Sequence, residues 1–278
     1  MQFGLYLPPF GDLARARELV EIARAAEDAG WDGFFLWDHV VRPPLDSGQL
    51  PAMADPWTVL SGVAAVTSRL RIGPMVTPLA RRRPQIVARQ SVTLDHLSDG
   101  RLTLGIGLGV NEGGELERFG EVTDEHVRSE RLDEALELLL SLWSGDTVDH
   151  EGPHFIARGV TFLPVPVQRP RIPLWGAALG RRPRLGPLRR AAALDGIFPV
   201  LATPDQIRWI LDVIRNERGS LEGFDVALEL PPDAPAARLD GLIELGANWA
   251  MVGLTETTSL SEAIALARSD PARRFGAG

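Results

Sequence analysis

An acid and a histidine stand side by side at Asp38 and His39, directly after the apolar run Gly33–Trp37. Histidine changes charge near neutral pH, so it can pass a proton, and a neighbouring aspartate can orient its ring or tune its proton affinity. The run before the pair has the length and composition of a buried strand. The pattern predicts either a catalytic pair at a strand end or a histidine that merely caps the strand.

A glycine-rich run, Leu102–Gly109, contains glycines at alternating positions. It does not match a dinucleotide fingerprint, because the third required glycine falls at Val110 in one register and at Glu112 in the other. Two interpretations remain. Gly107 and Gly109 leave room for a ring system to approach the backbone, or they allow tight packing inside a barrel. Asn111, Glu112 and Glu115 follow in a loop from which they could reach a substrate, but we expect them to be solvated.

Another irregular strand end is Gly73–Pro78, where two prolines and a glycine predict a bulge. The bulge could press backbone against a flat ligand, or it could be an ordinary loop before the next helix. Three arginines, Arg81 to Arg83, follow it. We expect them to form a solvated surface rim.

A possible phosphate cradle follows the apolar run at Pro173–Gly176. Small residues come first (Gly176, Ala177, Ala178 and Gly180), then Arg181, and then a predicted helix. Free backbone N–H groups and a helix amino terminus both favour an anion. The alternative is a loop with solvated arginines.

Other chemistries find little support. His150–His154 spells the zinc-protease pattern H-E-x-x-H, but Gly152-Pro153 in its middle is incompatible with the helix that this metal site requires. The chain has no cysteine, which excludes thiol nucleophiles and thiolate metal ligands. No Gly-x-Ser-x-Gly elbow occurs. We expect no metal site.

Short apolar runs alternate with longer amphipathic ones, as in repeated βα units over a parallel sheet. The predicted strands are Gln2–Leu7, Gly33–Trp37, Leu70–Val76, Leu102–Gly107, Pro173–Gly176, Gly196–Val200, Asp225–Leu228 and Trp249–Gly253. The predicted helices are Leu13–Ala29, Pro56–Thr67, Pro84–Leu97, Glu125–Trp143, Leu185–Ala193, Pro204–Arg218, Ala234–Leu245 and Ser259–Ala267. Eight such units match the size of a (β/α)8 TIM barrel, in which polar residues at the carboxyl ends of strands carry the chemistry.

The pattern breaks between the fourth helix and the fifth strand. Residues 145–171 read as a β-hairpin followed by a Pro-rich return, which we interpret as an insertion into a single domain spanning residues 1–278. The last residues, Asp270–Gly278, are expected to be a frayed tail.

Charge and hydropathy limit the partners. The net charge is −8, with 29 basic and 37 acidic residues, so we expect neither nucleic acid nor an anionic membrane as a partner. A small-molecule substrate is the default. No stretch has about eighteen uninterrupted apolar residues and Met1–Leu7 does not resemble a signal peptide, which predicts a soluble cytoplasmic protein.

Four stretches taken together resemble the luciferase-like flavin- and deazaflavin-dependent oxidoreductase superfamily. They are Asp32–His39, Arg71–Pro78 with its arginine-rich exit, Leu94–Gly109 and Arg190–Gly196, and they occur in the family's order over nearly the whole chain. The resemblance implies a barrel with a flavin-type cofactor at its carboxyl face, partly covered by the insertion. It also implies that the protein assembles as a homodimer.

The resemblance assigns roles to particular residues. It implies a cis peptide at Met75-Val76 in the strand-three bulge, where these two residues support the central ring of the cofactor. His39, preceded by Asp38, matches the family's cofactor-side histidine. The resemblance therefore favours the functional interpretation of both the bulge and the histidine.

Two departures bear on the cofactor and substrate. Sugar-phosphate dehydrogenases of the family carry a catalytic glutamate where this chain has Val110, and bacterial luciferases carry an FMN-phosphate arginine where it has Leu108. The first argues against sugar-phosphate oxidation, and the second favours the deazaflavin coenzyme F420 over FMN.

The expected function is therefore hydride transfer between F420 or FMN and a small, apolar organic substrate. His39 would move the proton, Asp38 would orient it, Gly107 and Gly109 would admit the ring, and Gly176–Arg181 would hold the phosphate. One alternative is an FMN-dependent monooxygenase that uses oxygen and externally reduced flavin. Another is a non-catalytic flavin-binding or structural barrel.

Overall fold

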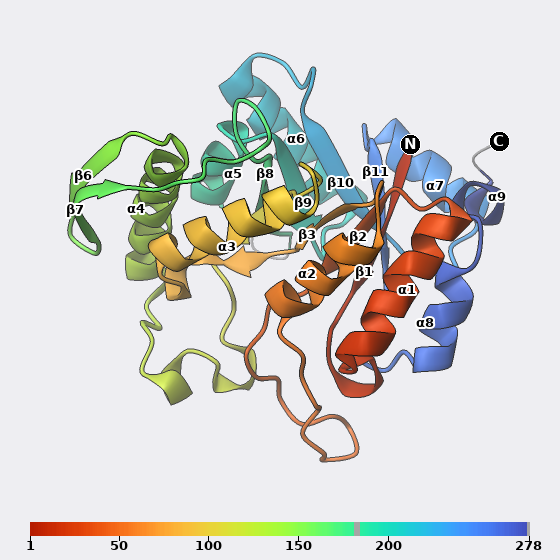
Figure 1. The fold of residues 1–278 in the computed structure, drawn as a ribbon. Coiled ribbons are helices and arrows are strands. Elements are labelled where there is room, and N and C mark those ends of the chain that lie inside the picture. Colours follow the sequence, from red (N-terminus) through yellow and green to blue (C-terminus); the bar gives the residue numbers. More distant parts are fainter. Residues whose placement is uncertain (181–183, 277–278) are drawn as a thin grey trace.

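A computed structural model describes residues 1–180 and 184–276, and its centre is a parallel barrel (Figure 1). The barrel strands are β1 (Gln2–Leu7), β2 (Gly33–Leu36), β3 (Arg71–Pro74), β4 (Thr77–Pro78), β5 (Leu104–Gly107), β8 (Leu174–Leu179), β9 (Gly196–Val200), β10 (Asp225–Leu230) and β11 (Trp249–Gly253). They lie in the order β3-β2-β1-β11-β10-β9-β8-β5-β4. Neighbouring barrel strands pair in parallel throughout this order.

The barrel closes through one interrupted strand. β3 pairs with β2, β4 pairs with β5, and the cis peptide Met75-Val76 lies between β3 and β4. An isolated parallel bridge joins Ile72 to Leu102, so both halves of this strand lie against the β5 segment. The nine strands of the sheet therefore fill eight barrel positions, and the predicted (β/α)8 TIM barrel is confirmed. The cis peptide implied by the resemblance is confirmed as well.

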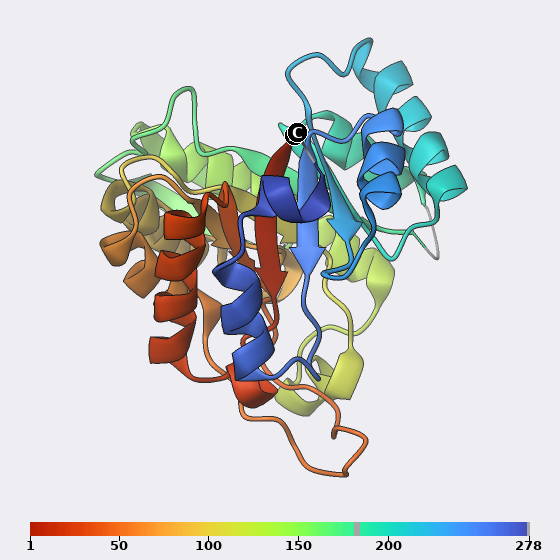
Figure 2. The same cartoon turned by 90° about the vertical axis from the view of Figure 1, so that its right-hand side faces the viewer.

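Helices surround the barrel. They are α1 (Ala16–Ala29), α2 (Pro56–Val66), α3 (Pro84–Leu97), α4 (Glu125–Trp143), α5 (Leu185–Ala192), α6 (Pro204–Arg218), α7 (Ala236–Glu244), α8 (Leu260–Ala267) and α9 (Pro271–Phe275). Prolines at the first helical position explain why α2, α3 and α6 begin where the sequence predicts. The loop after β2 and the short helices after β5 lie together at one end of the barrel, at the bottom of Figures 1 and 2.

Two apolar cores hold these layers together. The larger lies between strands and helices and contains residues such as Leu36, Leu60 and Leu104. The smaller fills the barrel interior and consists of Tyr6, Phe35, Met75, Trp175, Phe198, Ala227, Trp249 and Met251. Aromatic rings dominate it, so the barrel is packed at its centre.

The insertion is a β-hairpin of β6 (Thr147–Glu151) and β7 (Ile156–Thr161), as predicted. Glu134 of α4 fixes it, because its carboxylate lies 3.0 Å from His150 Nε2 and accepts hydrogen bonds from the amides of His154 and Phe155. The two histidines of the H-E-x-x-H pattern therefore lie in or beside a hairpin that docks on a helix.

The expectation of a frayed tail is wrong for residues 271–275, which form α9. The Asp270 side chain accepts a hydrogen bond from the Arg273 amide, and Phe275 is 1% exposed and stacks on Phe3 at 5.8 Å between ring centroids. Burial of an aromatic ring holds this segment against β1. No helix among the described residues is long and apolar enough to cross a membrane.

Candidate active site at the barrel mouth

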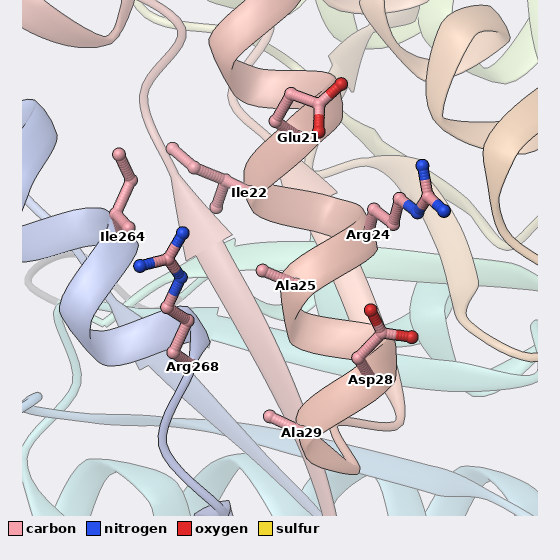
Figure 3. Close-up of a pocket in the computed structure, with 8 residues that line it drawn as sticks. All are labelled: Glu21, Ile22, Arg24, Ala25, Asp28, Ala29, Ile264 and Arg268. Carbon is pink, nitrogen blue, oxygen red and sulfur yellow. The ribbon is translucent and has the colours of Figure 1, made fainter.

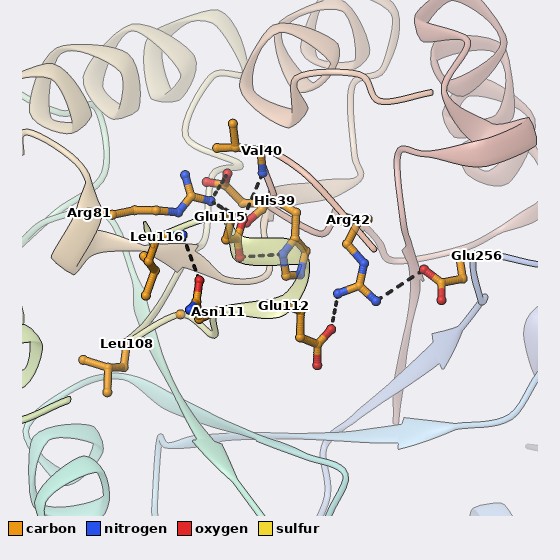
Figure 4. Close-up of polar contacts among 12 residues, drawn as sticks. His39, Val40, Arg42, Arg81, Leu108, Asn111, Glu112, Glu115, Leu116 and Glu256 are labelled. Atoms are coloured by element: carbon orange, nitrogen blue, oxygen red, sulfur yellow. Dashed lines mark hydrogen bonds and ion pairs between the residues drawn. The ribbon is translucent and has the colours of Figure 1, made fainter. Parts of the chain in front are cut away.

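His39 lies just beyond the carboxyl end of β2, and its partner is Glu115. His39 Nδ1 is 2.9 Å from Glu115 Oε1, while Glu115 Oε2 accepts a hydrogen bond from the Val40 amide at 3.1 Å (Figure 4). The Glu115 side chain is 1% exposed and that of His39 is 16% exposed. The expectation that Glu115 is solvated is therefore wrong.

Glu115 is held ionised by its surroundings. Burial raises the pKa of its carboxyl, but the hydrogen bond and charge of His39, the Val40 amide and the charge of Arg81 together outweigh burial. The pKa of Glu115 consequently lies below its usual value. An ionised carboxylate can only accept, so His39 donates from Nδ1 and its Nε2 carries no proton in the neutral ring.

Asp38 does not contact the His39 ring, and the expectation that it orients the histidine is wrong. Its buried carboxylate accepts hydrogen bonds from Trp57 Nε1 at 3.3 Å and Thr77 Oγ1 at 3.1 Å, and it pairs with Arg82 at 2.7 Å. Asp38 and His39 lie beyond the last residue of β2, where neighbours in the chain need not point the same way. Asp38 instead joins β2 to β4 and α2.

Arg81 connects the two carboxylates. Its guanidinium lies 3.6 Å from Asp38 and 3.5 Å from Glu115, and it donates to the Asp38 carbonyl at 3.1 Å. Its side chain is 8% exposed and that of Arg82 is 18% exposed, so the predicted arginine rim is wrong at both positions. The positive charges of Arg81 and Arg82 thus offset the negative charges of Asp38 and Glu115. Burial lowers the pKa of Arg81, and the charges of Asp38 and Glu115 oppose this effect.

The sequence offered one signal for these arginines that our prediction did not use. They follow a strand next to β2, and the carboxyl ends of neighbouring parallel strands meet at one edge. A buried acid at one strand end and cations at the next therefore favour an ion pair. Glu115 had no such signal, because it follows a loop whose path the residues alone do not define.

The glycines of β5 make room for the bulge. A Cβ at Gly105 would lie 2.7 Å from Met75 Sδ, and one at Gly107 would lie 2.7 Å from Val76 Cγ2. At Gly109, whose φ is +77°, a Cβ would meet Pro78 at 2.7 Å. These glycines thus allow close packing inside the barrel, and any approach of a cofactor ring to Gly107 and Gly109 stays a prediction. Val76 is only partly buried, whereas Met75 is 1% exposed.

The fifth barrel strand is longer than predicted, because β8 continues past Gly176 to Leu179. A Cβ at Gly176 would meet Ala191 of α5 at 2.9 Å, so helix packing explains this glycine. The Gly180 amide donates to the Val200 carbonyl. Arg181 lies outside the described residues, and the phosphate role of Gly176, Ala177, Ala178, Gly180 and Arg181 stays a prediction.

Arg42 joins three loops across the mouth. It pairs with Glu112 in the loop after β5 and with Glu256 in the loop after β11, the latter at 3.3 Å (Figure 4). Its guanidinium lies 5.5 Å from the centroid of the Phe10 ring, and its side chain is 9% exposed. A charge held this way by two carboxylates links segments that β-sheet pairing does not connect.

A cavity of about 520 Å³ lies elsewhere, between the outer faces of α1 and α8 (Figure 3). Charged side chains of both signs surround it, among them Asp28 and Arg268, over small residues such as Ala25. In a parallel barrel the chemistry belongs to the loops at the carboxyl ends of strands, and this cavity lies between helices outside the barrel. We therefore place the candidate site at the mouth, around His39.

The mouth suits a flat, flavin-type ring on structural grounds. Val76 presents a partly buried apolar side chain, and His39 presents a partly exposed ring. The buried Trp37 Nε1 has no hydrogen-bond partner in the described residues. A buried donor without a partner is costly unless a ligand or water satisfies it. The arrangement can bind an apolar ring system and pass a proton beside it.

Comparisons with known proteins agree with this fold. A family model described as luciferase-like monooxygenase matches residues 1–233. The F420-dependent glucose-6-phosphate dehydrogenase of Microbacterium testaceum (strain StLB037) is 34% identical over 170 residues, which cover 59% of this chain and 47% of that protein. The chain thus spans about half the length of the curated relative it matches.

Two solved structures resemble the whole barrel. Monooxygenase RslO1 from Streptomyces bottropensis has a TM-score of 0.81 and 20% identity, covering 96% of this chain and 97% of the other. The coenzyme F420 dependent tetrahydromethanopterin reductase from Methanopyrus kandleri has a TM-score of 0.79 and 19% identity, covering 99% of both chains. At these identities the likeness shows the fold alone.

Proposed function

Because the chain belongs to the luciferase-like monooxygenase family, we propose that it is an oxidoreductase that transfers a hydride between coenzyme F420 or FMN and a small organic substrate. The observation that carries the proposal is the pair His39–Glu115 at the barrel mouth, with Nδ1 and Oε1 2.9 Å apart. A carboxylate that fixes one ring nitrogen leaves the other nitrogen for proton transfer.

His39 supplies the proton step in this proposal. With the Nδ1 proton directed at Glu115, Nε2 can take a proton from a substrate hydroxyl, and the carboxylate stabilises the imidazolium that results. In the opposite direction the imidazolium gives this proton to a carbonyl oxygen. Asp38 acts at a distance as a positioning residue, since it holds Arg81, which in turn pairs with Glu115.

Other residues would bind the cofactor, which when bound supplies the hydride acceptor or donor. Met75 and Val76 would support the ring. Gly107 and Gly109 have no side chains and so leave room for the bulge that contains these two residues. Residues from Gly176 to Arg181 would contact the phosphate at the exit of β8. The packed barrel interior would keep water from the side of the ring that faces it.

The F420-dependent relatives and the replacement of the luciferase arginine by Leu108 favour F420. The proposal does not extend to glucose 6-phosphate, because the sugar-phosphate enzymes carry a catalytic glutamate where this chain has Val110.

Titration of the purified protein with F420 and, separately, with FMN tests the proposal, with binding followed by cofactor fluorescence. We expect micromolar affinity for F420 and weaker binding of FMN. Tight binding of FMN alone, with oxygen uptake when reduced FMN is supplied, would instead support the monooxygenase alternative. Micromolar binding of neither would contradict an enzymatic role of this kind.

A further inference from the structure

The inner face of the barrel mouth carries two ionisable groups, Tyr6 on β1 and Glu229 on β10. Tyr6 of β1 pairs in register with Gly253 of β11, and Met251 of β11 pairs with Glu229 of β10. Side chains in register on neighbouring strands point to the same side of the sheet. Tyr6 and Met251 belong to the interior core, so Gly253 and Glu229 also face the interior of the barrel.

Gly253 leaves space at this level. A Cβ built there would have a single neighbour within 4 Å, Tyr6 Cδ1 at 3.8 Å. Deeper in the barrel the glycines are filled, because a Cβ at Gly4 or Gly33 would lie within about 3 Å of the Phe35 ring. Gly253 and Glu229 are only partly buried, so the space opens toward the mouth.

Aromatic rings surround the space. The Tyr6 ring lies 5.4 Å from Trp37 and 5.0 Å from Phe198 between centroids. The buried Trp37 Nε1 has no hydrogen-bond partner in the described residues. This indole N–H is a donor, so the walls are apolar but hold an unused hydrogen bond.

Glu229 adds a partly buried carboxyl group to this space. Burial raises the pKa of its carboxyl, and the Leu201 amide opposes this only in part. Leu201 has a φ of +54°, which places its backbone in the left-handed region at the end of β9. Burial, and after it the charge of Glu229, raises the pKa of Tyr6 well above its usual value, so the phenol keeps its proton and can donate it in a hydrogen bond.

We propose that the space beside Gly253 is a substrate subsite in which Tyr6 and Glu229 bind an uncharged oxygen-bearing group. The inference rests on the proposed function and adds a substrate class to it. The class is a neutral organic molecule with an apolar body and a carbonyl, hydroxyl or ether oxygen. A phosphate or carboxylate fits this space poorly, because Glu229 would repel it when ionised and the Tyr6 phenol carries no compensating positive charge.

Tyr6 provides the readout, since it is the single tyrosine of the chain. Protein labelled with ¹³Cζ-tyrosine gives one resonance, which reports hydrogen bonding at the phenol without any turnover. Butanone and 2-oxobutyrate differ by a carboxylate, so they separate the effects of charge and shape. We expect butanone to shift the resonance saturably, and 2-oxobutyrate to leave it unchanged at the same concentrations.

Variants locate the response. Gly253→Ala should fold normally, because its Cβ makes an ordinary contact, and should weaken butanone binding by about tenfold. Glu229→Leu should weaken it by a similar factor, while Glu229→Gln, which retains a donor, should stay within about threefold. Gly241→Ala on α7 and the exposed Glu222→Gln are matched controls that should leave binding unchanged.

The outcomes separate the subsite from the cofactor hypothesis. A resonance that does not move with butanone, moves equally with 2-oxobutyrate, or moves with F420 alone would overturn the subsite, whatever the cofactor titration shows. If butanone binds as expected but neither F420 nor FMN does, the proposed function fails and the binding site remains.

Discussion

His39 and Glu115 are 76 residues apart in the chain, yet the Nδ1 of one lies 2.9 Å from a carboxylate oxygen of the other. The contact joins the loop after β2 to the loop after β5, across the position of the interrupted strand β3–β4. Glu115 also accepts from the Val40 amide, so one buried carboxylate fixes both the ring and the backbone beside it. This is the pattern by which a histidine is prepared for proton transfer.

Glu115→Gln should make stability less dependent on pH in the acid range. The pKa of Glu115 is lowered in the folded protein, so between its folded and unfolded values the unfolded chain binds more protons. Stability from Glu115 is therefore present above the unfolded pKa and is lost as pH falls through the folded pKa. Urea unfolding should show Glu115→Gln less stable by about 1–3 kcal/mol at pH 7, with the difference shrinking toward low pH.

The matched control is Glu244→Gln on the exposed side of α7, which should follow the wild-type curve at every pH. A difference between Glu115→Gln and wild type that stays constant down to strongly acid pH would contradict the ionised state of Glu115.

Asp38→Asn should lower the free energy of unfolding. The activity of the molecules that still fold should fall less. The substitution leaves Arg82 and Arg81 without the charge that they pair with, at a site where Asp38 is 4% exposed. Breaking a buried ion pair on one side costs about 3–5 kcal/mol. Asp212→Asn, which removes a surface pair with Arg215, should change stability by less than about 0.5 kcal/mol. Equal unfolding midpoints for the two variants would refute this role of Asp38.

Gly107→Ala should destabilise the protein through Val76. The new Cβ would lie 2.7 Å from Val76 Cγ2, and overpacking of this kind costs about 1–3 kcal/mol. Val76→Ala removes the clashing methyl groups, so the double variant should recover at least half of the loss caused by Gly107→Ala. Additive losses in a double-mutant cycle of urea unfolding would mean that the glycine and the bulge are independent.

Arg42→Met should loosen the loops at the mouth without unfolding the barrel. The methionine keeps the apolar stem over Phe10 but removes the pairs with Glu112 and Glu256. Hydrogen exchange should become faster in residues 40–53 and 110–116, while the strands keep their protection. Arg24→Met on α1 is the control. Unchanged exchange in both loops would show that Arg42 does not hold them.

The barrel could be predicted because its signals are local. Alternating apolar runs, prolines at Pro56, Pro84 and Pro204, and glycines after helices each act within one element, and α3, α4 and α6 have the predicted bounds. The hairpin insertion could be predicted for the same reason. The tail was not, because the burial of Phe275 against Phe3 depends on a contact across the whole chain.

The candidate site could be predicted only in part. His39 and the Met75-Val76 bulge were identified from motifs, but the residue that orients His39 was assigned to its neighbour Asp38 when it is Glu115. Adjacency in sequence was a poor guide, since loops from different strands meet at the mouth. The sequence predicted where the glycine-rich strand lies but left two interpretations of its glycines open. Only their distances to Val76 and Pro78 show what they pack against.

The most direct test of the account compares His39→Ala with wild type in two measurements on the same cofactor-loaded protein. Cofactor affinity is measured by fluorescence titration, and the hydride-transfer rate is measured in a single turnover. The account predicts affinity within a few fold of wild type and a rate lowered by about 10²-fold or more, because the proton then lacks its acceptor. An unchanged rate would contradict the role of His39, whatever the affinity.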